Sequence, residues 1–178
     1  MLRKFEEIST KTLDLVELNE EMIDSIFIMM ANRFVMQYTG IDVHESKKET
    51  EMWIDDRKQE AEDKREYTWA IKLKSDVVVG WISAKDCSQN SYLITCVEDS
   101  QFWRFGYMTE ALNQIIQYLF SRCDAEHVIG GCHPDNKRSE NLMRKVGMHR
   151  VWLDKVYFNT SGEAEGFQHV YSIDRFKL

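Results

Sequence analysis

The chain has 178 residues, of which 43% are hydrophobic and 30% are charged, and its formal net charge at pH 7 is -7. This length and composition predict one folded domain with a full apolar core, and the negative charge argues against nucleic acid as a general partner, because binding to phosphates needs a positive face. No apolar run approaches the length that spans a bilayer and residues 1–7 lack the apolar stretch of a signal peptide, so we expect a cytoplasmic protein that binds no membrane.

The first third of the chain predicts one strand and two helices. Residues 12–18 alternate apolar and polar side chains, which indicates a strand, and residues 22–34 are rich in Met, Ile and Phe, which indicates a helix. Ser46 and Glu49 form a capping-box pattern that opens a second helix ending at about Lys64. This helix is heavily charged, so it is either a lid over a site or a solvated face, and the solvated face is favoured.

Three strands and a long helix follow. Residues 67–73 and 77–85 are rich in β-forming residues and are separated by a short turn, as in a hairpin, and residues 91–97 form the next strand. Residues 106–122 then carry the clearest helical pattern. Its apolar stripe has a period of 3.6 residues and consists of Met108, Ala111, Leu112, Ile115, Ile116, Leu119 and Phe120.

The last part of the chain adds three strands and one helix. We expect a strand at residues 127–132, a helix at 137–145, and closing strands at 149–159 and 167–173 joined by a turn at 160–166. The predicted order is β, α, α, β, β, β, α, β, α, β, β. Such an order favours a mixed sheet with helices on both faces.

The most informative segment runs from Trp103 to Ala111, where a turn containing Gly106 leads directly from a strand region into the long helix. The first N–H groups of a helix have no partner inside it, and the helix dipole adds partial positive charge there. The turn therefore predicts an anion site suited to phosphates.

Two motifs support this prediction, W-x-x-G-Y-x-T-E-A at residues 103–111 and P-x-N-x-x-S-x-x-L-x-x-K-x-G-M at residues 134–148. With them, the segment from about Ser91 to Trp152 resembles the acyl-CoA-binding half of the GNAT superfamily of N-acetyltransferases, and within it the RimJ/RimL-like branch. The resemblance implies a single GNAT-like acetyltransferase domain over residues 1–178. Its fold class would be α/β (α+β), with a mixed, largely antiparallel sheet and helices on both faces.

The implied activity is acetyl-CoA-dependent N-acetyl transfer, with acetyl-CoA as co-substrate and no metal. The acetyl group would pass directly to a primary amine, either a protein N-terminus or a small molecule, and a homodimer is left open. An alternative is an acyl-CoA-binding module without transferase activity. A nucleotide-binding α/β domain is weaker, because the chain has neither G-x-G-x-x-G nor G-x-x-x-x-G-K-[ST].

The resemblance places CoA contacts in the glycine turn. Where the superfamily usually has Q/R-x-x-G-x-G/A, this chain has Trp103, Gly106 and Met108. The Met108 side chain would either crowd the phosphates or turn into the core, and Arg104 would add a cation beside them. The implied contact residues here are Trp103, Arg104, Phe105, Gly106, Tyr107, Met108 and Thr109.

The family stabilises the thioester oxygen with backbone N–H groups of a splayed strand, and the matching residues are Cys96, Val97 and Glu98. Broken alternation around residues 95–97 is compatible with a β-bulge. Glu98 is the candidate base for the amine proton, with Asp99 second and His133 third. A solvent-facing junction between strand and turn is the other interpretation of Glu98.

Much of the superfamily has a tyrosine acid where this chain has Met143. The resemblance then implies that Ser139 assists the leaving thiolate, with a purely local cap as the alternative. Asn136 is implied to bind the amides of the pantetheine arm of CoA, to cap its helix, or to do both.

The acceptor amine is expected between residues 22–41, the charged helix and the closing hairpin. Aromatic or soft side chains there suit an amine-binding cleft, although such residues are more often core: Phe34, Met36, Tyr38, Trp69 and Trp81.

The cysteines show no C-x-x-C spacing, and the histidines show no spacing typical of metal ligands. We therefore expect reduced, mostly buried thiols and no zinc site. The cysteines are Cys87, Cys96, Cys123 and Cys132.

Overall fold

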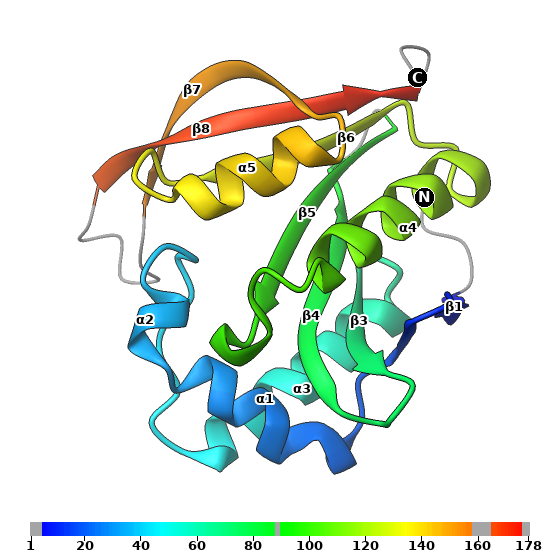
Figure 1. The fold of residues 1–178 in the computed structure, drawn as a ribbon, viewed down its shortest axis with the longest axis vertical. Coiled ribbons are helices and arrows are strands. Elements are labelled where there is room, and N and C mark those ends of the chain that lie inside the picture. The colour runs from blue at the N-terminus through cyan, green and yellow to red at the C-terminus, as the bar shows by residue number, and fades with distance from the viewer. Residues whose placement is uncertain (1–4, 88–89, 158–164, 176–178) are drawn as a thin grey trace.

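A computed structural model describes residues 5–87, 90–157 and 165–175 of the chain. Eight strands form one sheet in the order β1-β2-β3-β4-β5-β6-β8-β7 (Figure 1). They are β1 (Ile8–Ser9), β2 (Leu13–Glu17), β3 (Glu66–Leu73), β4 (Val78–Asp86), β5 (Ser91–Glu98), β6 (His127–Cys132), β7 (His149–Tyr157) and β8 (Glu165–Asp174). Neighbouring strands are antiparallel except β5 and β6, which are parallel. The predicted mixed, largely antiparallel sheet is confirmed.

The helices cover both faces of this sheet, as expected. They are α1 (Ile23–Met30), α2 (Arg33–Met36), α3 (Lys47–Glu62), α4 (Tyr107–Arg122) and α5 (Lys137–Lys145), with the short 3-10 turns η1 (Glu20–Met22) and η2 (Ser100–Phe102). One buried cluster joins α4 to the sheet, and a second joins α1 and α2 to its other face. In Figure 1, α3 and α4 accordingly lie on opposite sides of β3 and β4.

The predicted helix at residues 22–34 is interrupted. Its chain divides into η1, α1 and α2, and α2 begins after Asn32, whose side chain accepts a hydrogen bond from the N–H of Phe34 at 3.1 Å. An asparagine that bonds to nearby backbone competes with the helix ladder, which explains the break. The capping box is confirmed, because the Ser46 hydroxyl accepts from the N–H of Glu49 and the Glu49 carboxylate accepts from the N–H of Glu45.

The remaining boundaries differ little from the prediction. The two-residue strand β1 was not predicted, because so short a segment has no periodicity to detect. The closing turn was expected at residues 160–166, and residues 158–164 lie outside the described part of the chain.

The predicted bulge at residues 95–97 is wrong. The register between β4 and β5 is continuous from Asp86↔Tyr92 to Gly80↔Glu98. The irregularity lies instead between β3 and β4, where the register skips Val79. What changes along β5 is its other neighbour, because β6 pairs with it only as far as Ile94 and leaves the edge of β5 open beyond that residue.

No helix in the described ranges has both the length and the apolar character required to cross a bilayer.

Candidate active site

The larger cavity of the protein has a volume of about 860 Å³ and opens where β5 and β6 part. Its walls come from the end of β5, the first turn of α4, the first turn of α5 and the segment around α2. Most of the predicted site residues line it. Those on the wall are Cys96, Val97, Glu98, Trp103, Arg104, Gly106, Met108, Thr109, Asn136 and Ser139.

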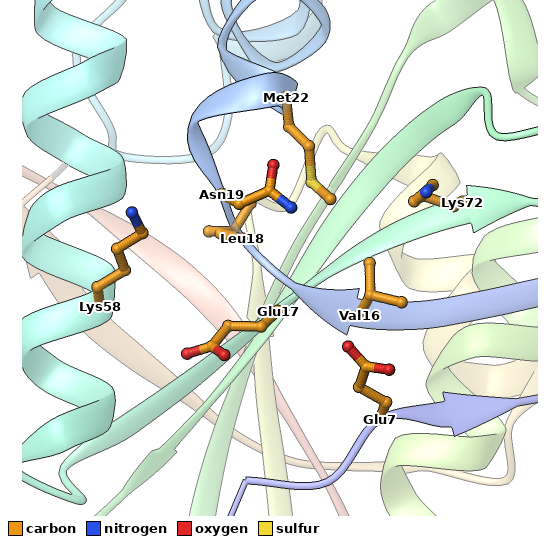
Figure 2. Close-up of a pocket in the computed structure, with 8 residues that line it drawn as sticks. All are labelled: Glu7, Val16, Glu17, Leu18, Asn19, Met22, Lys58 and Lys72. Atoms are coloured by element: carbon orange, nitrogen blue, oxygen red, sulfur yellow. The ribbon is translucent and has the colours of Figure 1, made fainter.

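A smaller cavity of about 450 Å³ lies at the end of β2, beside α3 and β3 (Figure 2). Its two lysines have acidic partners, since Lys58 pairs with Glu20 at 3.0 Å and Lys72 pairs with Asp76 at 2.8 Å. None of the predicted site residues lines it. The larger cavity is therefore the candidate site.

The first turn of α4 is built for an external partner. Gly106 is the N-cap, with a φ of 90°, and no side chain caps the helix there. Only glycine adopts this backbone conformation without strain, which accounts for Gly106 at this position. The N–H groups of the first helical turn have no partner within the helix, and the first backbone bond back to the cap is that of Glu110 to Gly106, so the turn can hold an anion.

One of these N–H groups is already used within the protein. The N–H of Met108 donates to the carboxylate of Glu98 at 3.2 Å. The Met108 side chain is buried and points away, so that its methyl group would lie 3.3 Å from a Cβ placed on Gly80. Of the two predicted outcomes for Met108, turning into the core is the one observed, and the side chain does not crowd the turn.

The open edge of β5 presents backbone groups to the cavity. At one end of the β4–β5 ladder the N–H of Asp99 donates to Val79, and at the other end the N–H of Cys87 donates to Ser91. The residues of β5 that bond to β4 are therefore the odd-numbered ones. Because antiparallel bonds alternate along a strand, the N–H groups of Cys96 and Glu98 point away from β4, into the gap that β6 has left. The N–H of Val97 belongs by the same alternation to the β4 ladder.

Glu98 stands at this edge with an unusual acidity. Burial raises the pKa of its carboxyl to about 7, and the Met108 N–H bond and the charge of Arg138 oppose that rise. A carboxyl poised near neutral pH is suited to accept a proton. The solvent-facing interpretation does not describe its position, because it is half-buried in the cavity wall.

The two other candidate bases have local structural roles. The Asp99 carboxylate accepts from the N–H of Gln101 at 3.0 Å and caps η2. His133 accepts from the N–H of Asp135 at 3.1 Å, and its ring stacks on Tyr38 at a centroid distance of 4.9 Å.

The first turn of α5 closes the other side of the gap. The Asn136 side chain accepts from the N–H of Ser139 at 3.1 Å, which confirms its capping role. Ser139 and Met143 line the cavity from the same helix, Met143 with its side chain buried. Burial raises the pKa of Cys96 to about 12, so this thiol stays protonated and cannot serve as a nucleophile.

Of the five residues considered for the acceptor side, two line the cavity and three are core residues. Phe34 and Tyr38 line the cavity, and Phe34 is 61% exposed. The other members of that set are core residues, at most 2% exposed: Met36, Trp69 and Trp81. The charged helix α3 supplies none of the lining residues, so it is a solvated face and no lid over this cavity.

Arg138 is one of the lining residues that the sequence did not indicate. Its guanidinium carbon lies 3.2 Å from the centre of the Trp103 ring. Its position two residues after Asn136 could have indicated a cation near the cofactor, but the local sequence does not show that its side chain lies against Trp103.

None of the four cysteines, all of which lie in the described ranges, forms a disulfide; Cys87 is exposed, and Cys123 and Cys132 are buried. The described part of the chain contains no cluster of three or more His, Cys, Asp or Glu side chains that could hold a metal ion.

Comparison with known proteins identifies the family to which this fold and site correspond. The family model for the acetyltransferase (GNAT) domain matches residues 12–149. YnaD of Bacillus subtilis (strain 168), named an uncharacterized N-acetyltransferase, is 25% identical over 164 residues, which cover 85% of this chain and 94% of YnaD.

Two solved structures have a similar fold. A GNAT-family acetyltransferase from Bacillus anthracis gives a TM-score of 0.84 at 20% identity, with 96% of this chain and 99% of that one covered. RimL, a ribosomal L7/L12 alpha-N-protein acetyltransferase in complex with CoA, gives 0.82 at 17% identity, with 95% and 98% covered.

Proposed function

The chain belongs to the acetyltransferase (GNAT) family and is an N-acetyltransferase. We propose that it moves the acetyl group of acetyl-CoA directly to a primary amine bound in the larger cavity. One observation carries the proposal. A half-buried carboxyl, Glu98, with a pKa of about 7 lies between the first turn of α4, where it accepts from the N–H of Met108 at 3.2 Å, and the open edge of β5. We further propose that residues 1–178 form one acetyltransferase domain of the RimJ/RimL-like branch, which the two sequence motifs support.

The residues present fit acetyl-CoA. The free N–H groups at the start of α4, with Arg104 beside them, would hold the pyrophosphate. The open edge of β5 and the amide of Asn136 would pair with the pantetheine arm. Acetyl-CoA supplies a thioester, whose carbonyl carbon an amine can attack.

The chain's own groups then have separate tasks. Glu98 accepts the proton of the attacking amine, directly or through water. One N–H group of the open β5 edge, that of Cys96 or that of Glu98, donates to the carbonyl oxygen as it gains negative charge, and the other is left for the pantetheine arm. Ser139 donates its hydroxyl proton in a hydrogen bond to the sulfur as the carbon–sulfur bond breaks. The thiolate is a weak base and a fair leaving group without help, so this last contribution is modest.

Two measurements on the intact protein test the proposal. CoA at a hundredfold excess over its Kd should stabilise the protein by about 2.7 kcal/mol, seen as a higher Tm. Release of free thiol from acetyl-CoA should occur with at least one member of a panel of amines. An unchanged Tm in saturating CoA would remove the proposed site. Binding without turnover on any amine would favour an acyl-CoA-binding module instead.

A further inference from the structure

Arg138 lines the candidate site and is an exposed residue, so its guanidinium can reach a ligand. It rests on the face of Trp103, 3.2 Å from the ring centre. No described residue accepts a hydrogen bond from it or forms an ion pair with it within 4 Å. An arginine has five N–H donors in a planar fork, and a fork of this kind matches a carboxylate.

The Trp103 ring beneath this fork is held from two sides. The Nε1–H of Trp103 donates to the carbonyl oxygen of Glu98 at 2.9 Å. On the acceptor side, the Trp103 ring packs against Phe34 at a centroid distance of 5.4 Å. Arg138 thus bridges the gap between α5 and the segment before α4, at the reacting end of the cavity.

Arg138 also lies near the proposed base. Its charge opposes the rise in the pKa of Glu98, and burial lowers its own pKa. One negative and one positive group therefore face the same space without forming a direct ion pair. A ligand that carries both an ammonium and a carboxylate complements such an arrangement.

The other charges of the cavity point the same way. Glu98 is the single carboxylate among the lining residues that the structure describes, and the cationic ones are Arg104, Lys137, Arg138 and Lys145. The protein as a whole has a net charge of -7, so this cavity is positive within a negative chain. With Arg104 assigned to the pyrophosphate of CoA, a polycationic amine would still meet the charge of Arg138 close to Glu98, and these cations would repel each other.

We propose that the acceptor is an amine with a carboxylate close to its nitrogen, of the amino-acid type, and that Arg138 binds this carboxylate while Glu98 faces the amine. The proposal rests on the proposed function for the reaction itself. Phe34 and Tyr38, the lining rings at this end, would contact the remainder of the acceptor.

The test uses two readouts, turnover and binding. The twenty amino acids are assayed as acceptors with acetyl-CoA, and the best is compared with its α-amide, with its decarboxylated amine and with spermidine. A peptide that begins with Asp is included, to distinguish a free amino acid from an acidic N-terminus. Binding of the same compounds to the CoA-saturated protein is measured by calorimetry.

The expected result is a preference for the carboxylated acceptor of at least tenfold in kcat/KM over its amide. Arg138→Gln should lower kcat/KM for that acceptor by about ten- to a hundredfold, mainly through KM, because a hydrogen bond to a charged group is lost. It should leave the amide unaffected, and Arg138→Lys should restore part of the loss. Arg144→Gln is the matched control on the same helix, since Arg144 pairs with Glu140 at 2.7 Å and does not line the cavity.

Three outcomes would overturn the inference. They are amides or spermidine exceeding every amino acid, an equal loss with both acceptors in Arg138→Gln, and no binding of any carboxylated amine to the CoA-saturated protein. Binding that depends on Arg138 without turnover would support the inference and contradict the proposed transferase function. Turnover of amines that is indifferent to Arg138 would do the reverse.

Discussion

Two helices begin at the same cavity, and their first turns are finished differently. α4 starts at Gly106, which has no side chain to cap it, whereas α5 starts at Asn136, whose side chain accepts from the N–H of Ser139. The first turn of α5 is capped by its own N-cap residue, whereas in α4 Glu98 of β5 takes the N–H of Met108 and the rest of the turn is left for a partner. A helix N-terminus is an anion site only where the chain does not fill it itself.

The first turn of α4 also binds a carboxylate of the protein itself. The Glu98 carboxylate lies on the N–H of Met108, and its pKa of about 7 allows it to be neutral or charged at physiological pH. The two turns therefore differ in electrostatics as well as in geometry. The experiments below separate them.

The largest effect is expected from Gly106→Asp. The new carboxylate would compete with phosphate for the α4 N–H groups and repel it, so CoA should bind at least a hundredfold more weakly. A φ of 90° strains any residue with a side chain, and Gly106→Ala isolates this strain, because nothing lies within 4 Å of its Cβ. Calorimetry with CoA measures both variants. Unaltered affinity in folded Gly106→Asp would place the phosphates elsewhere.

Glu98→Gln should lower kcat/KM by about a hundredfold or more, because the amide cannot accept the amine proton. The activity of the unmodified protein should fall below pH 7, as the carboxyl becomes protonated, and this acidic limb should vanish in the variant. Asp99→Asn is the control, since it keeps the oxygen that caps η2 and should keep the limb. A limb that persists in Glu98→Gln would assign the base to another group.

The same variant changes stability with a definite sign. The folded pKa of Glu98 lies above the ordinary value of 4.5, so the folded protein binds more protons between these pH values, and its stability falls as pH rises through them. Glu98→Gln escapes this loss. Relative to the unmodified protein it should gain about 1 kcal/mol of unfolding free energy between pH 4 and pH 8, a value discounted for solvent that reaches the cavity. Urea unfolding at both pH values measures it.

A smaller effect is expected on the α5 side. Ser139→Ala should reduce turnover by about ten- to a hundredfold and change CoA affinity less. Ser139→Thr keeps the hydroxyl and should retain most of the activity. Unchanged steady-state turnover in Ser139→Ala would show that the thiolate leaves without this residue.

Asn136→Ala should have the smallest effect on chemistry. Loss of the cap should cost about 1 kcal/mol of stability, and CoA affinity should fall by about fivefold while turnover at saturation is kept. Asn136→Ser separates the two roles, because serine caps a helix but offers no amide to the pantetheine arm. Full CoA affinity in Asn136→Ser would leave Asn136 as a cap alone.

How far the sequence predicts the site depends on the range of each interaction. Gly106, Ser46 and Asn136 were identified at helix starts because capping and left-handed turns are decided by a few neighbouring residues. Trp69 and Trp81 were wrongly considered for the cleft, since burial depends on which face of the sheet a distant helix covers. The predicted bulge was wrong for a similar reason: broken alternation in β5 reflects the loss of its neighbour β6.

By itself, then, the sequence determined the order of strands and helices, the open turn of α4 and the capped turn of α5, because period, glycine and cap residues act locally. The tertiary structure alone decided that Met108 turns inward, that Glu98 is half-buried on its N–H, and that Arg138 meets Trp103 across the gap. The first two depend on how α4 packs against β4 and β5, and the third depends on where α5 lies beyond β6. Such positions are set by packing between segments distant in the chain, and no local pattern encodes them.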